Sequence, residues 1–135
     1  MPGETDLTRL LRTMQPELQP GNYVFCTVAS LDGLAVADMV GLFREREGLT
    51  VILPQATADR LQLPYSFVAA WLTLMVHSSL EAVGLTAAVA RVLAQAGVSC
   101  NVVAAYYHDH IFVAATDAHK ALGLLQQLAA TGEAE

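Results

Sequence analysis

Residues 72–115 read LTLMVHSSLEAVGLTAAVARVLAQAGVSCNVVAAYYHDHIFVAA, and this stretch decides the fold of the chain. Its pattern predicts an apolar strand, a Ser-rich loop, a helix over residues 83–96 and a strand over residues 100–107. A hairpin turn at His108-Asp109 then leads into a return strand over residues 110–115. The stretch is therefore a β-α-β-β unit, and the loop before its helix suits a small ligand.

The segments beside this unit extend it toward a complete domain. The first strand is expected over residues 67–77, and because both of its faces are largely apolar, it should be central and covered on both sides. A last helix is expected after Thr116 or Asp117, with the buried stripe Ala121, Leu124, Leu125 and Leu128. A ferredoxin-like βαββαβ fold needs one more strand after that helix, and the strand expected over residues 23–29 can fill the place.

The N-terminal half reads as a degenerate copy of the same unit. Its expected elements are a helix over 6–14, strands over 23–29 and 49–53, and helical turns over 57–63. Residues 39–46 fit a helix or a strand, and the turn at Glu47-Gly48 favours the strand. We therefore expect an α+β, pseudo-tandem ferredoxin-like fold, in which an antiparallel sheet carries its helices on one face. The halves are expected to divide into residues 1–66 and 67–135.

Composition excludes several classes of partner. Hydrophobic residues make up 54% of the chain and charged residues only 15%, so we expect part of the apolar surface to be buried in a homodimer. The net charge of −6 and the scattered Lys and Arg residues argue against nucleic acid and anionic membrane. No apolar run reaches the roughly 20 residues of a membrane span, and the N-terminal residues lack the apolar core of a secretion signal.

The two cysteines indicate a reducing compartment. Cys26 and Cys100 each lie in an apolar strand-like segment, and neither belongs to a CxxC pair. We therefore expect two reduced thiols in a cytoplasmic protein, with no disulfide and no cofactor.

The loop between the first strand and the helix carries the candidate binding residues. His77, Ser78, Ser79 and Glu81 lie in this loop, and Gly84 opens the helix. The free amides of a helix start suit a carboxylate, while Glu81 or Asp109 could face an ammonium group. On spacing alone the structural interpretation is favoured, because Ser78 and Glu81 also match a capping box.

The segments VGLTAAV at residues 83–89 and LAQAGVSCNV at residues 93–102 resemble the ACT-domain pattern. The phrases HSSLEAVGLTAAV and YYHDHIFV are similar to a small family of stand-alone ACT proteins. The clear resemblance covers residues 67–128, and the N-terminal half matches only this narrower family. ACT domains are ferredoxin-like, pair side by side and bind amino acids in regulatory proteins such as aspartate kinases and animal arginine sensors.

The resemblance implies a binding site made by two copies of the unit. The effector loop of the family falls on residues 77–85, and the facing strand falls on Ser99, Asn101 and Val102. In this chain the loop is longer and offers Ser78, Ser79 and Glu81 where the family usually has an Asp before the glycine. The implied ligand-binding set for a small amino acid or related metabolite is His77, Ser78, Ser79, Glu81, Val83, Gly84, Leu85, Asn101, Val102 and Asp109.

Two other functions stay open. His77, His108 and His110 could form a zinc site or a metal-dependent active site, although a His-Asp turn needs no metal. The chain could also be a protein–protein interaction module without a ligand. Nucleophilic catalysis is disfavoured, because Ser78, Ser79 and Cys100 lie in no motif such as GxSxG.

Overall fold

The computed structural model describes residues 6–76 and 83–132 of the chain. The chain divides into two compact units, which we name unit 1 (Met1–Gln19 and Ala70–Glu135) and unit 2 (Pro20–Ala69). The helix expected over residues 6–14 therefore belongs to the same compact unit as residues 70–135. The division of the sequence into halves at residues 66 and 67 stays a prediction.

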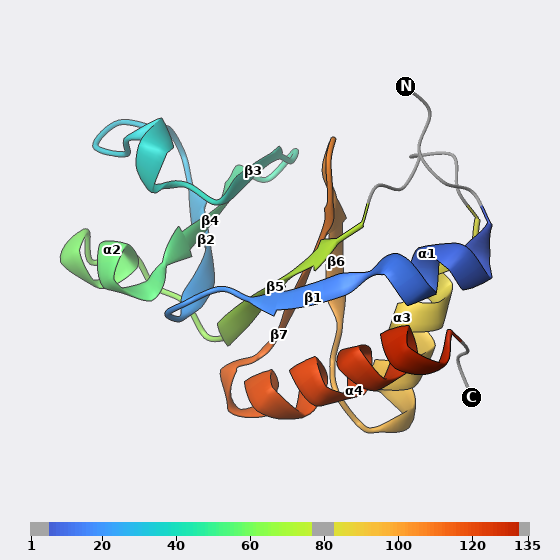
Figure 1. Cartoon of the computed structure of the whole chain (residues 1–135). Helices are drawn as coiled ribbons and strands as arrows, with labels where there is room; N and C mark the ends of the chain where they lie inside the picture. Colours follow the sequence, from blue (N-terminus) through green and yellow to red (C-terminus); the bar gives the residue numbers. More distant parts are fainter. Residues whose placement is uncertain (1–5, 77–82, 133–135) are drawn as a thin grey trace. The chain divides into compact units, whose positions relative to one another are not determined.

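Unit 1 has a sheet of four strands in the order β1-β5-β7-β6 (Figure 1). These are β1 (Gln15–Leu18), β5 (Val68–Met75), β6 (Asn101–Ala104) and β7 (Asp109–Ala114). Strand β1 runs antiparallel to β5, with Gln15 opposite Met75 and Leu18 opposite Leu72. Strand β5 is central, as its two apolar faces predict.

Three helices cover one face of this sheet: α1 (Leu7–Thr13), α3 (Leu85–Gln95) and α4 (Ala118–Thr131), the last preceded by the 3₁₀ turn η2 (Ala115–Asp117). Alternate residues of β5 and β7 belong to the core that the helices close. Fully buried members of this core are Leu10, Leu72, Leu93, Ile111, Val113, Ala121 and Leu125. The expected apolar stripe of the last helix is confirmed by the burial of Ala121, Leu125 and Leu128.

The chain order β5-α3-β6-β7-α4 is ferredoxin-like, and the fourth strand is supplied by β1 from the N-terminal end. The expectation that residues 23–29 fill this place was wrong. That strand, β2 (Tyr23–Val28), pairs with only the start of β5, at Ala69 and Val68. Strand β1 was not predicted because it contains Pro16, which usually argues against a strand. Proline is tolerated in a strand at a sheet edge, where its missing N–H is not needed for pairing.

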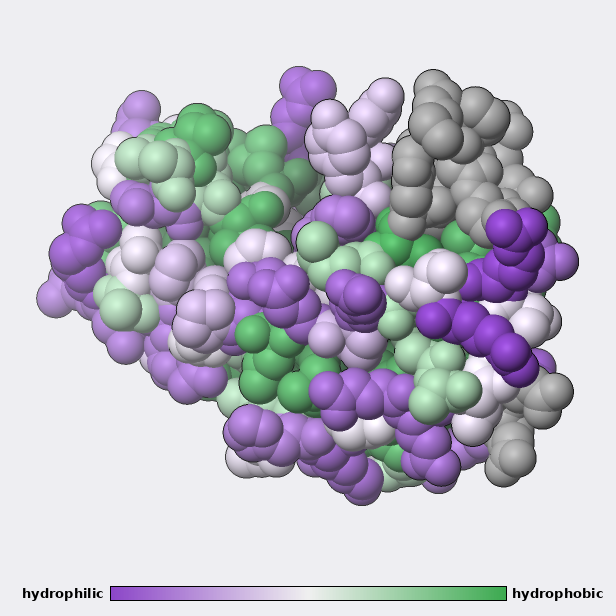
Figure 2. Space-filling model, in the orientation of Figure 1, coloured by the Kyte–Doolittle hydropathy of each residue, from purple (hydrophilic) through white to green (hydrophobic). Residues whose placement is uncertain are grey.

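Unit 2 has the order of elements expected for a degenerate copy. It contains β2, η1 (Val36–Asp38), β3 (Gly41–Arg44), β4 (Leu49–Pro54) and α2 (Gln55–Arg60). Strand β4 pairs antiparallel with both β2 and β3. Its core is small, namely Val24, Cys26, Val51, Leu53 and Ala58 with partly buried neighbours. Figure 2 shows apolar surface at the upper left, over η1 and β3, where Val36, Leu42 and Phe43 are exposed.

The turn between β6 and β7 is not where the sequence predicted it. The expected tip was His108-Asp109, whereas Asp109 is the first residue of β7 and lies opposite Ala104. The amide of Ala105 donates to the carbonyl of His108 at 3.1 Å, so Tyr106 and Tyr107 form the tip. These exposed tyrosine rings contact each other edge to face, with centroids 4.9 Å apart, which stabilises a turn that lacks typical turn residues.

Among the described residues, no helix combines the length and the apolar character needed to cross a bilayer.

Candidate functional site

The start of α3 is the first candidate for ligand binding. Gly84 precedes the helix in a left-handed conformation with φ of 101°, which a glycine adopts without strain. Its carbonyl accepts the amide of Ala88 at 2.9 Å. Within the described part of the chain, no acceptor is found for the amides of residues 85–87, so this helix start can accept a carboxylate. Val83 is 83% exposed and Leu85 is buried.

A side chain of the chain itself lies over Gly84. A Cβ atom at this position would lie 3.2 Å from Cδ2 of Leu7 in α1. The left-handed backbone and the close approach of α1 therefore both explain why a glycine occupies position 84. A ligand at this helix start has to reach the amides from a side that Leu7 leaves open.

Asp109 lies at the end of the unit 1 sheet where the chain leaves β5 toward α3. This placement follows because His110 lies beside Thr73 and Phe112 stacks on Trp71, so β7 runs antiparallel to β5. Burial raises the pKa of the Asp109 carboxyl, and the nearby His110 and His108 partly offset this effect. An ammonium group placed beside Asp109 would stabilise its ionised form.

Asn101 and Val102 lie away from this end within a single copy. Asn101 pairs with Phe112, and its Nδ2 donates to the carbonyl of Phe112 at 3.3 Å. Phe112 stacks on Trp71, which is four residues before the end of β5, or about 13 Å along a strand. Asn101 also alternates onto the sheet face opposite the helices, whereas Val102 alternates toward them. Unit 1 alone therefore does not bring Asn101 to the start of α3.

Four members of the predicted set, His77, Ser78, Ser79 and Glu81, lie outside the described residues. The predicted capping box does not cap α3, because Gly84 occupies the N-cap position of that helix. In the parts of the chain that the structure covers, no three His, Cys, Asp or Glu side chains lie close enough to hold a metal ion. Nδ1 of His108 is buried, and no hydrogen-bond partner for it is found among the described residues.

Both cysteines are free thiols. Burial raises the pKa of Cys26 and of Cys100, so near neutral pH both stay protonated and are poor nucleophiles. That both thiols are reduced in the cell stays a prediction.

A shallow groove lies on the helical layer, far from the start of α3. Its walls are the C-terminal halves of two helices, contributing Val92, Gln95, Ala96, Leu124, Leu128 and Thr131. The lining mixes aliphatic side chains with Gln95, Gln127 and Thr131 and holds no charged group, so it does not complement a zwitterionic ligand.

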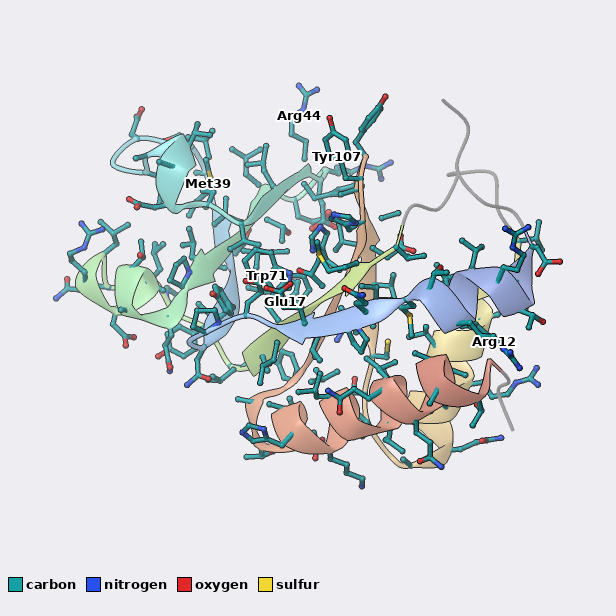
Figure 3. The ribbon with its side chains drawn as sticks, in the orientation of Figure 1. Arg12, Glu17, Met39, Arg44, Trp71 and Tyr107 are labelled. Carbon is teal, nitrogen blue, oxygen red and sulfur yellow. The ribbon has the colours of Figure 1, made fainter. Side chains whose placement is uncertain are left out.

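Sequence reasoning missed a polar network on the sheet face opposite the helices. Nε1 of Trp71 donates to Nδ1 of His110 at 3.0 Å, and Oγ1 of Thr73 lies 3.1 Å from the same nitrogen. Gln19 donates from Nε2 to Oγ1 of Thr73 at 3.0 Å. Figure 3 labels Trp71 on β5 and Glu17 on the neighbouring strand β1. The alternation of Trp71, Thr73 and Met75 along β5 was the available signal in the sequence.

The environment of Asp109 leads to a prediction about stability. Replacing Asp109 with asparagine is expected to raise the free energy of unfolding at pH 7 by up to about 1 kcal/mol, because it removes a charge that burial disfavours. The folded-state pKa is raised, so the cost of the charge is present at neutral pH and disappears once the carboxyl is protonated in both states. Urea denaturation at pH 7 and pH 3 measures this, and the gain should vanish at pH 3.

The exposed Asp32→Asn serves as the control for this measurement and should leave stability unchanged at both pH values. A loss of stability in Asp109→Asn at pH 7 would contradict the inferred cost of the charge.

Comparisons of the sequence give two matches to family models, and both are described as ACT domain. One covers residues 2–70 and the other covers residues 66–127. Together the matches span both halves of the chain. The N-terminal half, which we expected to be a degenerate copy, thus matches an ACT domain model of its own. None of the curated proteins matches the chain.

Solved structures give the same fold. A Vibrio cholerae protein of unknown function, described as a possible transport protein, is 48% identical with a TM-score of 0.79, and the alignment covers 91% of this chain and 95% of that one. The Agrobacterium tumefaciens protein Atu0741 is 16% identical with a TM-score of 0.63, over 86% and 89% of the two chains. The ligand-free regulatory subunit of Thermus thermophilus aspartate kinase is 10% identical with a TM-score of 0.57, over 87% and 97%.

Proposed function

The chain belongs to the ACT domain family, and on that premise we propose that it is a non-catalytic regulatory protein that binds a small amino acid or a related metabolite. The observation that carries this proposal is the start of α3, where the amides of residues 85–87 have no acceptor among the described residues. The likeness in fold to a regulatory subunit of aspartate kinase supports a regulatory role. A cytoplasmic location belongs to the same proposal.

The ligand is proposed to be a zwitterion. Its carboxylate accepts hydrogen bonds from the first amides of α3, where the helix dipole also favours negative charge. Its ammonium group lies toward Asp109. Burial raises the pKa of this carboxyl, so a nearby cation would stabilise its ionised form. Asp109 lies at the end of the sheet where β5 ends and β7 begins, and α3 is the first described helix that follows β5 in the chain. The loop residues His77, Ser78, Ser79 and Glu81 complete the proposed site.

A second copy of the chain is part of the proposal. Asn101 and Gly84 lie toward opposite ends of unit 1, so one ligand can contact both only if Asn101 comes from a partner copy. Strand β6, which carries Asn101, has β7 as its only strand neighbour in the described chain. Its residues Asn101–Ala104 contain no charge and no proline, the features that usually protect an edge strand from pairing. We therefore propose a homodimer in which the ligand joins the α3 start of one copy to β6 of the other and shifts their relative packing.

The test is a thermal-shift panel against the common amino acids, run with a measurement of molecular mass in solution. A ligand present at 100 times its dissociation constant is expected to stabilise the folded protein by about 2.7 kcal/mol, which appears as a clear rise in Tm. Asp109→Asn and Asn101→Ala should both weaken this shift, whereas Asp32→Asn should leave it unchanged. A monomer that binds normally would contradict the shared site.

If no amino acid raises Tm, the ligand-binding proposal fails. The chain would then be better explained as an ACT module that acts only through protein–protein contact. The mass measurement still reports whether that module pairs with itself.

A further inference from the structure

The polar network on the face of the unit 1 sheet opposite the helices fixes the protonation state of one histidine. An indole N–H can only donate, so the 3.0 Å contact from Nε1 of Trp71 requires Nδ1 of His110 to be an unprotonated acceptor. The neutral ring then carries its proton on Nε2. The hydroxyl of Thr73, which accepts from Gln19, is left to donate its own proton toward the same Nδ1.

The surroundings of His110 disfavour a second proton on the ring. His110 is about half buried, and the rings of Trp71 and His110 lie with their centroids 5.6 Å apart. Among the described residues, the charged and titratable groups near it are Asp109 on its own strand, His108 just before that strand, and Glu17 on β1, opposite Thr73. The described residues of β5 and β6 that share this face, including Trp71, Thr73, Asn101 and Val103, add no titratable group.

We propose that His110 is a proton-operated switch that holds or releases Trp71. A proton taken from solvent onto Nδ1 turns that nitrogen from an acceptor into a donor. The ring can then donate to Oγ1 of Thr73, whose hydroxyl turns away, but the indole N–H of Trp71 loses its acceptor. Because Trp71 is partly buried and a donor without an acceptor is costly there, the indole has to turn toward solvent or another acceptor. The sheet face thus has one arrangement when His110 is neutral and another when it is charged.

The direction of the pH dependence follows from the surroundings. Burial lowers the pKa of His110 below its ordinary value of 6.5, the charge on His108 lowers it further, and Asp109 raises it in part. The unfolded chain therefore takes up this proton at a higher pH than the folded chain does. The stability that comes from the neutral ring is present above pH 6.5 and is lost as the pH falls through the lower, folded-state pKa.

Trp71 is the only tryptophan in the chain, so its fluorescence reports on the switch directly. Between pH 8 and pH 5 we expect a sigmoidal loss of emission with a midpoint below 6.5, because an imidazolium in contact with an indole quenches it. His110→Gln, whose amide oxygen can still accept from Trp71, should abolish this transition. His119→Gln, which changes an exposed histidine on α4, should keep it. Circular dichroism over the same range checks that the fold persists.

A second measurement needs no variant. Long-range nitrogen–proton NMR spectra of the labelled protein at pH 8 should show His110 with a protonated Nε2 and an unprotonated Nδ1. The opposite tautomer, or an unchanged fluorescence titration in His110→Gln, would overturn the proposal. Both readouts are independent of amino-acid binding, so they stand or fall separately from the proposed function.

Discussion

Replacing Phe112 with alanine is expected to lower the free energy of unfolding by about 3–5 kcal/mol, the range found when a buried phenylalanine is truncated. Phe112 is 1% exposed and lies in β7, stacked on Trp71 with ring centroids 6.1 Å apart. Its side chain alternates away from the helical core, which Ile111 and Val113 enter. A large loss would therefore establish that the sheet face opposite the helices is as well packed as the face that the helices cover.

Urea denaturation followed by circular dichroism measures this effect. Phe43→Ala is the matched control, because it makes the same chemical change at a side chain that is 72% exposed. It should alter the free energy of unfolding by no more than about 0.5 kcal/mol. Equal losses in the two variants would contradict the burial that the structure gives to Phe112.

The second large effect is expected at Gly84. Alanine at this position should cost about 1–2 kcal/mol, because a residue with a Cβ is strained at a φ of 101°. The new Cβ would also lie 3.2 Å from Cδ2 of Leu7, so α1 has to shift or its contact is lost. The measured quantity is the midpoint of urea unfolding, followed by the emission of Trp71, which belongs to the same unit.

Gly123 offers a matched control with the opposite sign. It lies in the exposed part of α4, and an added Cβ there meets no atom within 4 Å in the described structure. Gly123→Ala should therefore raise stability by about 0.5–1 kcal/mol, through the better helix propensity of alanine. If Gly84→Ala were also stabilising, neither the strained conformation nor the contact with Leu7 could be correct.

Local patterns in the sequence predicted most of the elements correctly. The apolar stripe at 3.6-residue spacing predicted α3 and α4, and the apolar character of both faces of residues 67–77 predicted a central strand. The hairpin of residues 39–53 is also confirmed, as β3 and β4. These features depend on residues close together in the chain, and for that reason periodicity reveals them.

Long-range pairing was harder to predict. Strand β1 has four residues and one of them is Pro16, so its sequence resembles a loop. Only its register against β5 makes it a strand, and that register joins Gln15 to Met75. The network around His110 was missed for a related reason, since Trp71 and His110 meet only when β7 lies beside β5. The turn was misplaced because Asp109 is a common turn residue, whereas the observed turn is stabilised by two tyrosines.

The origin of β1 also has a consequence for biosynthesis. Helix α1 and strand β1 leave the ribosome well before the strand that β1 pairs with and the helices that α1 packs against. Native contacts of such long sequence separation form slowly, since a long loop has to close before they stabilise anything. The nascent N-terminal segment, including Leu10, Leu11 and Met14, therefore stays unburied until residues 70–131 have emerged, and during that interval it is a natural target for chaperones.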